Sequence, residues 1–145
     1  MGEEPDKVMR VVLDSNTVIS ALIFKGRTSA LRPLWKSGAI HLLASADMIR
    51  EYASVLAYTK FHLHEDEIQY LLEEELIPYL NPVSLGSPHL NWRPSDKKDL
   101  PFVIAALAGK AEFLISGDHH LLQLVHQYPF TIIAPGAFLD AHAGS

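Results

Sequence analysis

The sequence contains no cysteine. This absence excludes disulfide scaffolds, zinc ribbons built on thiolates, and thiol catalysis. No apolar run approaches the roughly 18 residues of a membrane-spanning helix. The opening residues 1–7 (MGEEPDK) also lack the basic-then-apolar order of a secretion signal. Together these absences predict a cytoplasmic protein that does not enter a membrane.

Basic residues are in short supply. The chain has 12 lysines and arginines against 17 aspartates and glutamates, a net charge of −5. Tight non-specific binding to duplex nucleic acid relies on a broad basic surface, so this balance argues against it. It does not exclude a nucleic-acid enzyme whose acidic site is neutralised by a divalent metal ion.

Length and composition predict one globular domain. The chain has 145 residues, of which 48% are hydrophobic and 20% are charged, and this composition excludes a disordered chain. We expect an N-terminal tail at residues 1–7, a single domain over residues 8–141, and a C-terminal tail at residues 142–145.

The order of short apolar runs and helical patterns predicts an α/β fold. Nearly continuous apolar runs predict buried strands at residues 8–14, 40–44, 113–116 and 130–134. Helical spacing predicts four helices: one capped by Thr28 or Ser29 and closed by Gly38, one that follows Ser45, one over residues 68–76, and one over residues 99–109. Residues 81–94 are rich in loop-forming residues. Strands that alternate with helices predict a mainly parallel sheet with helices on both faces.

Two of the predicted strands end in aspartate. Asp14 follows Val-Val-Leu, and Asp118 follows Phe-Leu-Ile-Ser-Gly. In open parallel sheets, ligands bind beyond the carboxyl ends of the strands. Neighbouring strands lie about 4.8 Å apart, so the two carboxylates can meet in one cleft if these strands are adjacent. The alternative for either residue is a solvated loop aspartate.

Glu51 and Asp99 are two further candidates. Glu51 falls about 40° outside the apolar arc of its predicted helix, at the border of the buried face. Its alternative role is a boundary glutamate paired with a lysine or arginine. Asp99 opens a predicted helix, where it could act only as a capping acid, a role that Asp96 could equally fill.

These acids come from four separate segments, and the topology can bring them to one end of the sheet. Unpaired carboxylates that pack together repel one another, and a divalent cation removes the conflict. All-oxygen ligands suit Mg²⁺ or Mn²⁺, which bind phosphate oxygens well. The residues therefore predict metal-dependent phosphoryl chemistry.

Three stretches carry a family resemblance. VVLDSNTVIS, Glu51 within MIREYASVL, and DKKDLPFVIAALAGKAEFLISGDHHLL together resemble the PIN-domain family, most closely its bacterial branch of VapC-like toxin components. The similarity runs from Val11 to about Leu139. It implies a three-layer α/β/α fold and a Mg²⁺- or Mn²⁺-dependent endoribonuclease acting on single-stranded or looped RNA. It also implies an antitoxin protein as partner and a homodimer.

The resemblance assigns roles to individual positions. In the implied mechanism, bound metal activates water for in-line attack on the scissile phosphate, and the metal ligands are Asp14, Glu51, Asp99 and Asp118. Residues that support the site are Asn16 and Ser116, and Asp96 matches an acid that is frequent in this branch. One position departs from the family, because His120 stands where a further acid is common. A neutral histidine suits Mg²⁺ poorly, so this departure bears on metal preference or activity.

Substrate affinity is expected from basic residues near the acids. Those nearest the exit of the first strand are Lys25, Arg27, Arg32 and Lys36, and those nearest the later acids are Arg93, Lys97 and Lys98. The alternative for each is a solvated surface charge.

Two other functions compete with the nuclease. A haloacid-dehalogenase-like phosphatase also places an aspartate after its first strand, but it needs a second aspartate two positions on, where this chain has Asn16. The non-enzymatic alternative is a PIN-like module that has lost activity and only binds RNA or a partner. His120 and the net charge of −5 support this non-enzymatic alternative.

Overall fold

The central sheet is parallel throughout. A computed structural model of the chain describes residues 8–84, 99–124 and 128–142. Within these residues five strands form one sheet in the order β3-β2-β1-β4-β5, and every neighbouring pair is parallel. The strands are β1 (Met9–Leu13), β2 (Ile40–Ala44), β3 (Leu80–Pro82), β4 (Phe113–Ile115) and β5 (Thr131–Ile133).

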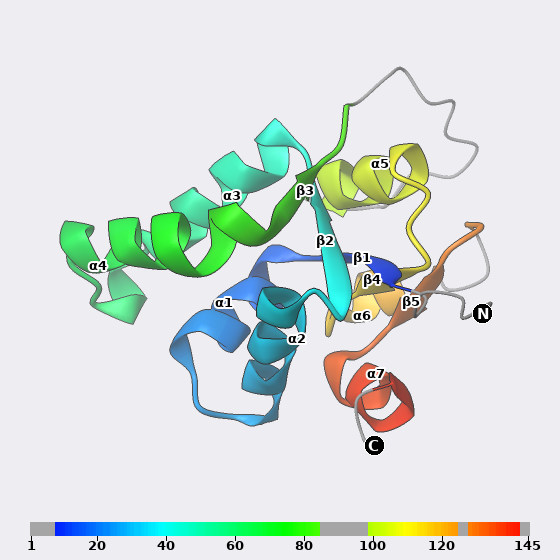
Figure 1. Cartoon of the computed structure of the whole chain (residues 1–145), viewed down its shortest axis with the longest axis horizontal. Helices are drawn as coiled ribbons and strands as arrows, with labels where there is room; N and C mark the ends of the chain where they lie inside the picture. Colours follow the sequence, from blue (N-terminus) through cyan, green and yellow to red (C-terminus); the bar gives the residue numbers. More distant parts are fainter. Residues whose placement is uncertain (1–7, 85–98, 125–127, 143–145) are drawn as a thin grey trace, which may run out of the picture.

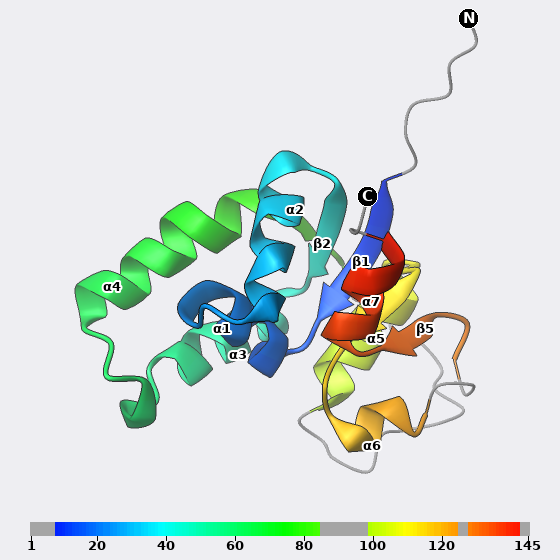
Figure 2. The same ribbon diagram turned by 90° about the horizontal axis from the view of Figure 1, so that it is seen from below.

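Helices cover both faces of the sheet. Figure 1 shows α3 and α5 on one side and α2 and α7 on the other, and Figure 2 shows the same layers from below. The α-helices are α1 (Ser15–Ile23), α2 (Leu31–Ser37), α3 (Ala46–Leu56), α4 (Glu65–Tyr70), α5 (Leu100–Ala108), α6 (His119–Leu122) and α7 (Pro135–His142). Shorter turns are η1 (Arg27–Ala30), η2 (Thr59–Phe61) and η4 (Ile77–Tyr79), and η3 (Leu71–Leu76) is a π-helix. The predicted three-layer α/β/α class is confirmed.

The strands are apolar because both of their faces are covered. Val11, Val12 and Leu13 of β1 are at most 1% exposed. A strand buried on both faces has no solvent side on which polar residues could alternate. The buried central strand β1 therefore holds in place the residues that follow Leu13 at the carboxyl end of the sheet.

Helix ends confirm some local predictions and overturn others. Ser45 caps α3 by accepting a hydrogen bond from the Met48 amide (3.2 Å), and Gly38 closes α2 with φ of +85°. The predicted cap at Thr28 or Ser29 is wrong. Those residues lie in η1, which continues directly into α2, and the Ser29 hydroxyl donates to the Gly26 carbonyl oxygen instead (2.7 Å).

Among the α-helices and strands of the described residues, four were not expected from the sequence. They are α1, β3, α6 and α7. The strand β3 overlaps the start of the stretch 81–94 that was predicted as a loop, so the loop prediction is wrong for its first two residues, Asn81 and Pro82. The predicted helix over residues 68–76 changes type, because α4 gives way to the π-helix η3. In the described ranges, no helix combines the length and hydropathy needed to cross a bilayer.

Candidate active site

The site lies at the carboxyl edge of the two central strands. Leu13 of β1 pairs with Ile115 of β4, so the next residues, Asp14 and Ser116, occupy neighbouring positions just beyond the sheet. The Asp14 amide continues the ladder by donating to the Ile115 carbonyl oxygen (3.3 Å). The parallel register therefore brings together two side chains that are 102 residues apart.

Asp14 is held in place by both carboxylate oxygens. Its Oδ1 accepts a hydrogen bond from the Thr17 amide (3.0 Å) as the N-cap of α1, and its Oδ2 accepts one from the Ser116 hydroxyl. The Ser116 hydroxyl oxygen in turn accepts from the Asp118 amide (2.9 Å). This chain of hydrogen bonds ties the end of β1 to the loop that follows β4.

Burial makes the negative charge of Asp14 unfavourable. The residue is 6% exposed. Loss of solvation is the largest effect on the pKa of Asp14 and raises it above 3.8. The hydrogen bonds from Ser116 and Thr17 lower this pKa, and the nearby Asp118 carboxylate raises it. A cation beside Asp14 would relieve both of the effects that raise the pKa.

The other three acids come from three different elements. Asp118 caps α6 by accepting a hydrogen bond from the His120 amide (2.8 Å). Asp99 immediately precedes α5 and is 7% exposed, yet its carboxylate makes no capping hydrogen bond to that helix. Glu51 is half-buried in α3. The Asp99 side chain therefore does not cap α5, which was the alternative role considered for it.

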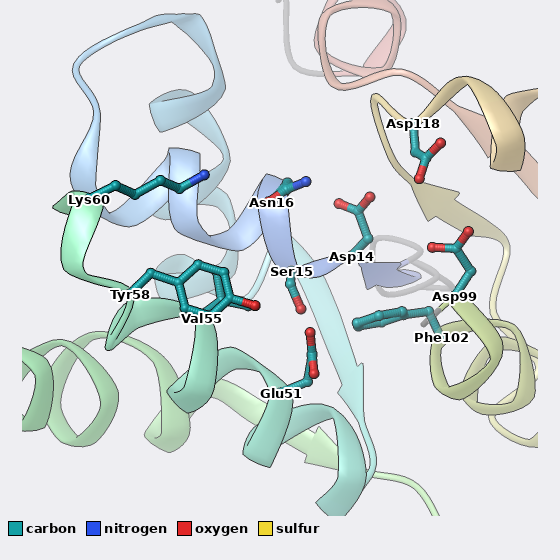
Figure 3. Close-up of a pocket in the computed structure, with 10 residues that line it drawn as sticks. All are labelled: Asp14, Ser15, Asn16, Glu51, Val55, Tyr58, Lys60, Asp99, Phe102 and Asp118. Carbon is teal, nitrogen blue, oxygen red and sulfur yellow. The ribbon is translucent and has the colours of Figure 1, made fainter. Parts of the chain in front are cut away.

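All four acids line one cavity of about 290 Å³ (Figure 3). In that view Asp14, Asp99 and Asp118 point toward a common space from their separate elements, and Glu51 faces it from α3. The Ser15 side chain points toward Glu51. The complete lining is Asp14, Ser15, Asn16, Glu51, Val55, Tyr58, Lys60, Asp99, Phe102 and Asp118.

The donors suit a hydrated divalent ion rather than a dry metal cage. Among the described residues, no three His, Asp or Glu side chains are grouped tightly enough to form a ready-made metal centre. Mg²⁺ does not need one, since it usually keeps several waters and is held through one or two carboxylates. The cavity offers carboxylate, amide and hydroxyl oxygens. Ser15 adds a buried hydroxyl for which the described part of the chain provides no hydrogen-bond partner.

Three of the predicted RNA-binding residues have protein partners instead. Arg27 pairs with Asp140, while Arg32 and Lys36 both approach the buried Glu75. None of the three lines the acidic cavity in the described structure.

The remaining predicted residues fall in several places. Lys25 is exposed, and the His120 side chain is exposed and does not belong to the described cavity lining. Asn16 does line the cavity. Arg93, Asp96, Lys97 and Lys98 lie outside the described residues.

Five residues of the described cavity lining were not predicted as site residues: Ser15, Val55, Tyr58, Lys60 and Phe102. Lys60 is the cation in the described lining, and Tyr58 stands beside it. Both residues follow the helix that carries Glu51, whereas the basic residues predicted to bind RNA follow the first strand or lie near the later acids. The available signal was the lysine next to an aromatic residue in Thr59-Lys60-Phe61, just after that helix.

Comparison with known proteins gives one family. A sequence model described as PIN domain matches residues 10–120, a span that contains all four acids of the cavity. A search of curated proteins gave no match. The match favours the nuclease fold over the dehalogenase-like alternative.

Proposed function

This chain belongs to the PIN-domain family, whose members are generally nucleases, and we propose that it is a metal-dependent endoribonuclease. The observation that carries the proposal is the convergence of four acids from four elements on one cavity beyond the carboxyl edge of the sheet. A carboxylate as buried as that of Asp14 is unfavourable without a compensating positive charge.

The metal ligands in this proposal are Asp14, Asp99 and Asp118, and Glu51 either completes the set or orients the attacking water. A bound Mg²⁺ or Mn²⁺ supplies a water of lowered pKa and stabilises the charge that develops on the scissile phosphate. Ser116 acts as a positioning residue, because its hydroxyl donates to Asp14 and accepts from the Asp118 amide.

The chain's own groups define where the phosphate sits. Four carboxylates repel a bare phosphodiester, so the substrate enters only with a cation between them. Lys60 lines the side of the cavity away from Asp118 (Figure 3) and offers a positive charge to a neighbouring phosphate. Phe102 and Val55 are buried and form apolar parts of the wall.

The biological role proposed is that of a VapC-like toxin acting in the cytoplasm. It rests on the sequence resemblance, as do the antitoxin partner and the homodimer. Ile77 is 40% exposed beyond η3 and offers apolar surface for such a partner. Growth arrest on induced expression, relieved by Asp14→Asn, would support a toxin. Normal growth with an RNA-cleaving protein would refute the toxin role and leave the nuclease intact.

The test of the enzyme is cleavage of single-stranded RNA by the purified protein. Cleavage is expected with Mn²⁺ or Mg²⁺ and should be lost with EDTA or in Asp14→Asn. The control variant is Asp66→Asn, which alters an exposed aspartate in the first turn of α4. RNA binding without cleavage under both metals would indicate an inactive module. Hydrolysis of small phosphate esters with intact RNA would indicate a phosphatase.

A further inference from the structure

A second cavity adjoins the acidic one. It has a volume of about 480 Å³ and is formed by one side of α1 together with the η2 turn. Asn16 and Lys60 line both cavities, so the two spaces share a wall. The complete lining is Asn16, Ile19, Ser20, Ile23, Phe24, Lys60 and Phe61.

The second cavity combines aromatic surface with a cation. Phe24 is 51% exposed, which is unusual for a residue of its size, and its ring meets the Phe61 ring edge-on with centroids 6.0 Å apart. Lys60 Nζ lies 5.2 Å from the centroid of the Phe61 ring. In the described lining no acid is present, in contrast to the neighbouring cavity.

We propose that this second cavity binds a nucleobase of single-stranded RNA next to the scissile phosphate. The proposal rests on the nuclease function proposed above. Phe24 and Phe61 supply the aromatic faces on which the base stacks, and Lys60 pairs with the phosphate that joins this nucleotide to the one in the acidic cavity. Asn16 stands at the junction, where its amide can hydrogen-bond the sugar or the phosphate.

Continuity with the acidic cavity favours RNA over a protein segment. An apolar peptide would need only the aromatic rings of this cavity. A nucleotide chain needs a flat apolar surface for its base, a cation for the adjoining phosphate, and then a site for the next phosphate. The shared wall provides this order. The volume also falls within the roughly 300–1,000 Å³ of small-molecule sites.

Stacking on an aromatic side chain tolerates any base, because every base presents a π-face. The subsite should therefore sense whether a base is present, with little preference for which base it is. An abasic nucleotide next to the cleavage position should weaken binding to the wild-type protein and leave binding to Phe24→Ala unchanged.

The test measures the affinity of a fluorescent oligouridylate by anisotropy with Ca²⁺, a hard cation that oxygen ligands also bind, in place of Mn²⁺, and KM and kcat for its cleavage with Mn²⁺. Phe24→Ala should weaken binding or raise KM about 5- to 150-fold with little change in kcat. Phe24→Trp should restore most of the affinity, which a merely structural defect would not allow. Lys60→Gln should weaken binding and flatten its dependence on salt.

Matched controls separate this site from a general effect. Tyr70→Ala removes an aromatic side chain that is 55% exposed on α4. Lys110→Gln removes an exposed lysine just before β4, at the amino end of the strands and so opposite the acidic cavity. Both should bind and cleave RNA as the wild type does. Equal losses in these variants, or wild-type affinity in Phe24→Ala, would overturn the subsite.

Failure of the subsite is distinguishable from failure of the nuclease. RNA cleavage that depends on Asp14 but is unaffected by Phe24→Ala overturns the subsite alone. A wild-type protein that binds oligouridylate through Phe24 but never cleaves it overturns the nuclease alone. A wild-type protein that binds no oligouridylate with or without Mn²⁺ overturns the subsite. Dissociation of a dimer by Phe24→Ala without loss of RNA affinity would reassign the cavity to a self-interface.

Discussion

Replacing Asp14 by asparagine separates the stability of the metal-free fold from metal binding. Asparagine caps helices as well as aspartate does, so its side-chain oxygen can keep the hydrogen bond from the Thr17 amide. The change removes a negative charge that burial makes unfavourable. At neutral pH the metal-free variant should therefore unfold at a temperature equal to or above that of the wild type.

The pH dependence of this difference has a definite sign. The pKa of Asp14 in the folded protein is raised above 3.8, its ordinary value, chiefly because of burial. Between the unfolded and the folded pKa, the folded state binds more protons. The contribution of Asp14 to stability is thus fully present below the unfolded pKa and is lost as pH rises through the folded pKa. The difference in unfolding temperature between metal-free Asp14→Asn and the wild type should therefore shrink as pH falls toward 3.8.

If the proposed metal site is right, Mn²⁺ should reverse the stability order of the wild type and Asp14→Asn. A ligand present at 100 times its dissociation constant stabilises the folded state by about 2.7 kcal/mol. With an unfolding entropy of about 2.1 cal/mol/K per residue over 145 residues, each kcal/mol shifts the unfolding temperature by about 3 °C. Saturating Mn²⁺ should therefore raise the unfolding temperature of the wild type by about 9 °C and that of Asp14→Asn by little.

Differential scanning calorimetry with and without Mn²⁺ measures both effects. Asp66→Asn is the control, because it alters an exposed aspartate of α4 and should keep the full metal response. The reasoning would be refuted if Asp14→Asn kept the full Mn²⁺ response. It would also be refuted if the metal-free variant were clearly less stable than the wild type at neutral pH.

Three further substitutions test other parts of the same structure. Ser116→Ala removes a buried hydroxyl that donates to Asp14, and should lower the unfolding temperature by about 3–10 °C and Mn²⁺ affinity about 10- to 100-fold by calorimetric titration. Tyr52→Phe removes a buried hydrogen bond to the Leu13 carbonyl oxygen (2.6 Å) and should lower the unfolding temperature by about 3–10 °C. Burial raises the pKa of Tyr52 well above 10.0, so its contribution to stability is lost as pH rises beyond that value, and Tyr52→Phe should show less of this alkaline loss. Lys36→Gln should lower the unfolding temperature and leave RNA affinity unchanged in anisotropy titrations.

Each of these substitutions has a result that would count against it. Ser37→Ala is the control for Ser116→Ala, because the Ser37 hydroxyl makes only exposed hydrogen bonds, to the Leu34 carbonyl oxygen (3.2 Å) and from the Ala39 amide (3.3 Å). Unchanged Mn²⁺ affinity in Ser116→Ala would remove that hydroxyl from the support of the site. If Tyr52→Phe left the unfolding temperature unchanged, the hydrogen bond to the Leu13 carbonyl oxygen would contribute nothing net to stability. A large loss of RNA affinity in Lys36→Gln would restore that residue to the substrate surface.

The fold was predictable because its signals are local. Short runs such as that of β1 are apolar throughout, and the parallel arrangement follows from their alternation with helices. The helix α1 was missed because its first apolar residue, Val18, follows the end of β1 after only four polar residues, 14–17. Asp14 was interpreted as a metal ligand or a solvated loop residue, yet the same side chain also caps the start of a helix.

Two acids of the site, Asp14 and Asp118, were predictable for a topological reason. A residue that follows a strand of a parallel sheet must lie at the carboxyl edge, whatever the rest of the chain does. The position of Lys60 does not follow from such a rule, because it depends on how the turn after α3 packs against α1. Phe24 and Phe61 are 37 residues apart, and nothing in their local sequence indicates that their rings meet.

The distribution of positive charge follows from pairings that only the tertiary structure reveals. Arg32 and Lys36 lie close to the site in sequence, but Glu75 lies 39 residues beyond Lys36 and engages both. Such paired cations are poor partners for a phosphate, because binding it would leave a carboxylate that is 8% exposed without its compensating charge. Lys60 makes no salt bridge in the described structure and lines both cavities. In the proposed nuclease, a bound divalent ion and a few unengaged cations would attract RNA, and they would allow a chain of net charge −5 to act on a polyanion.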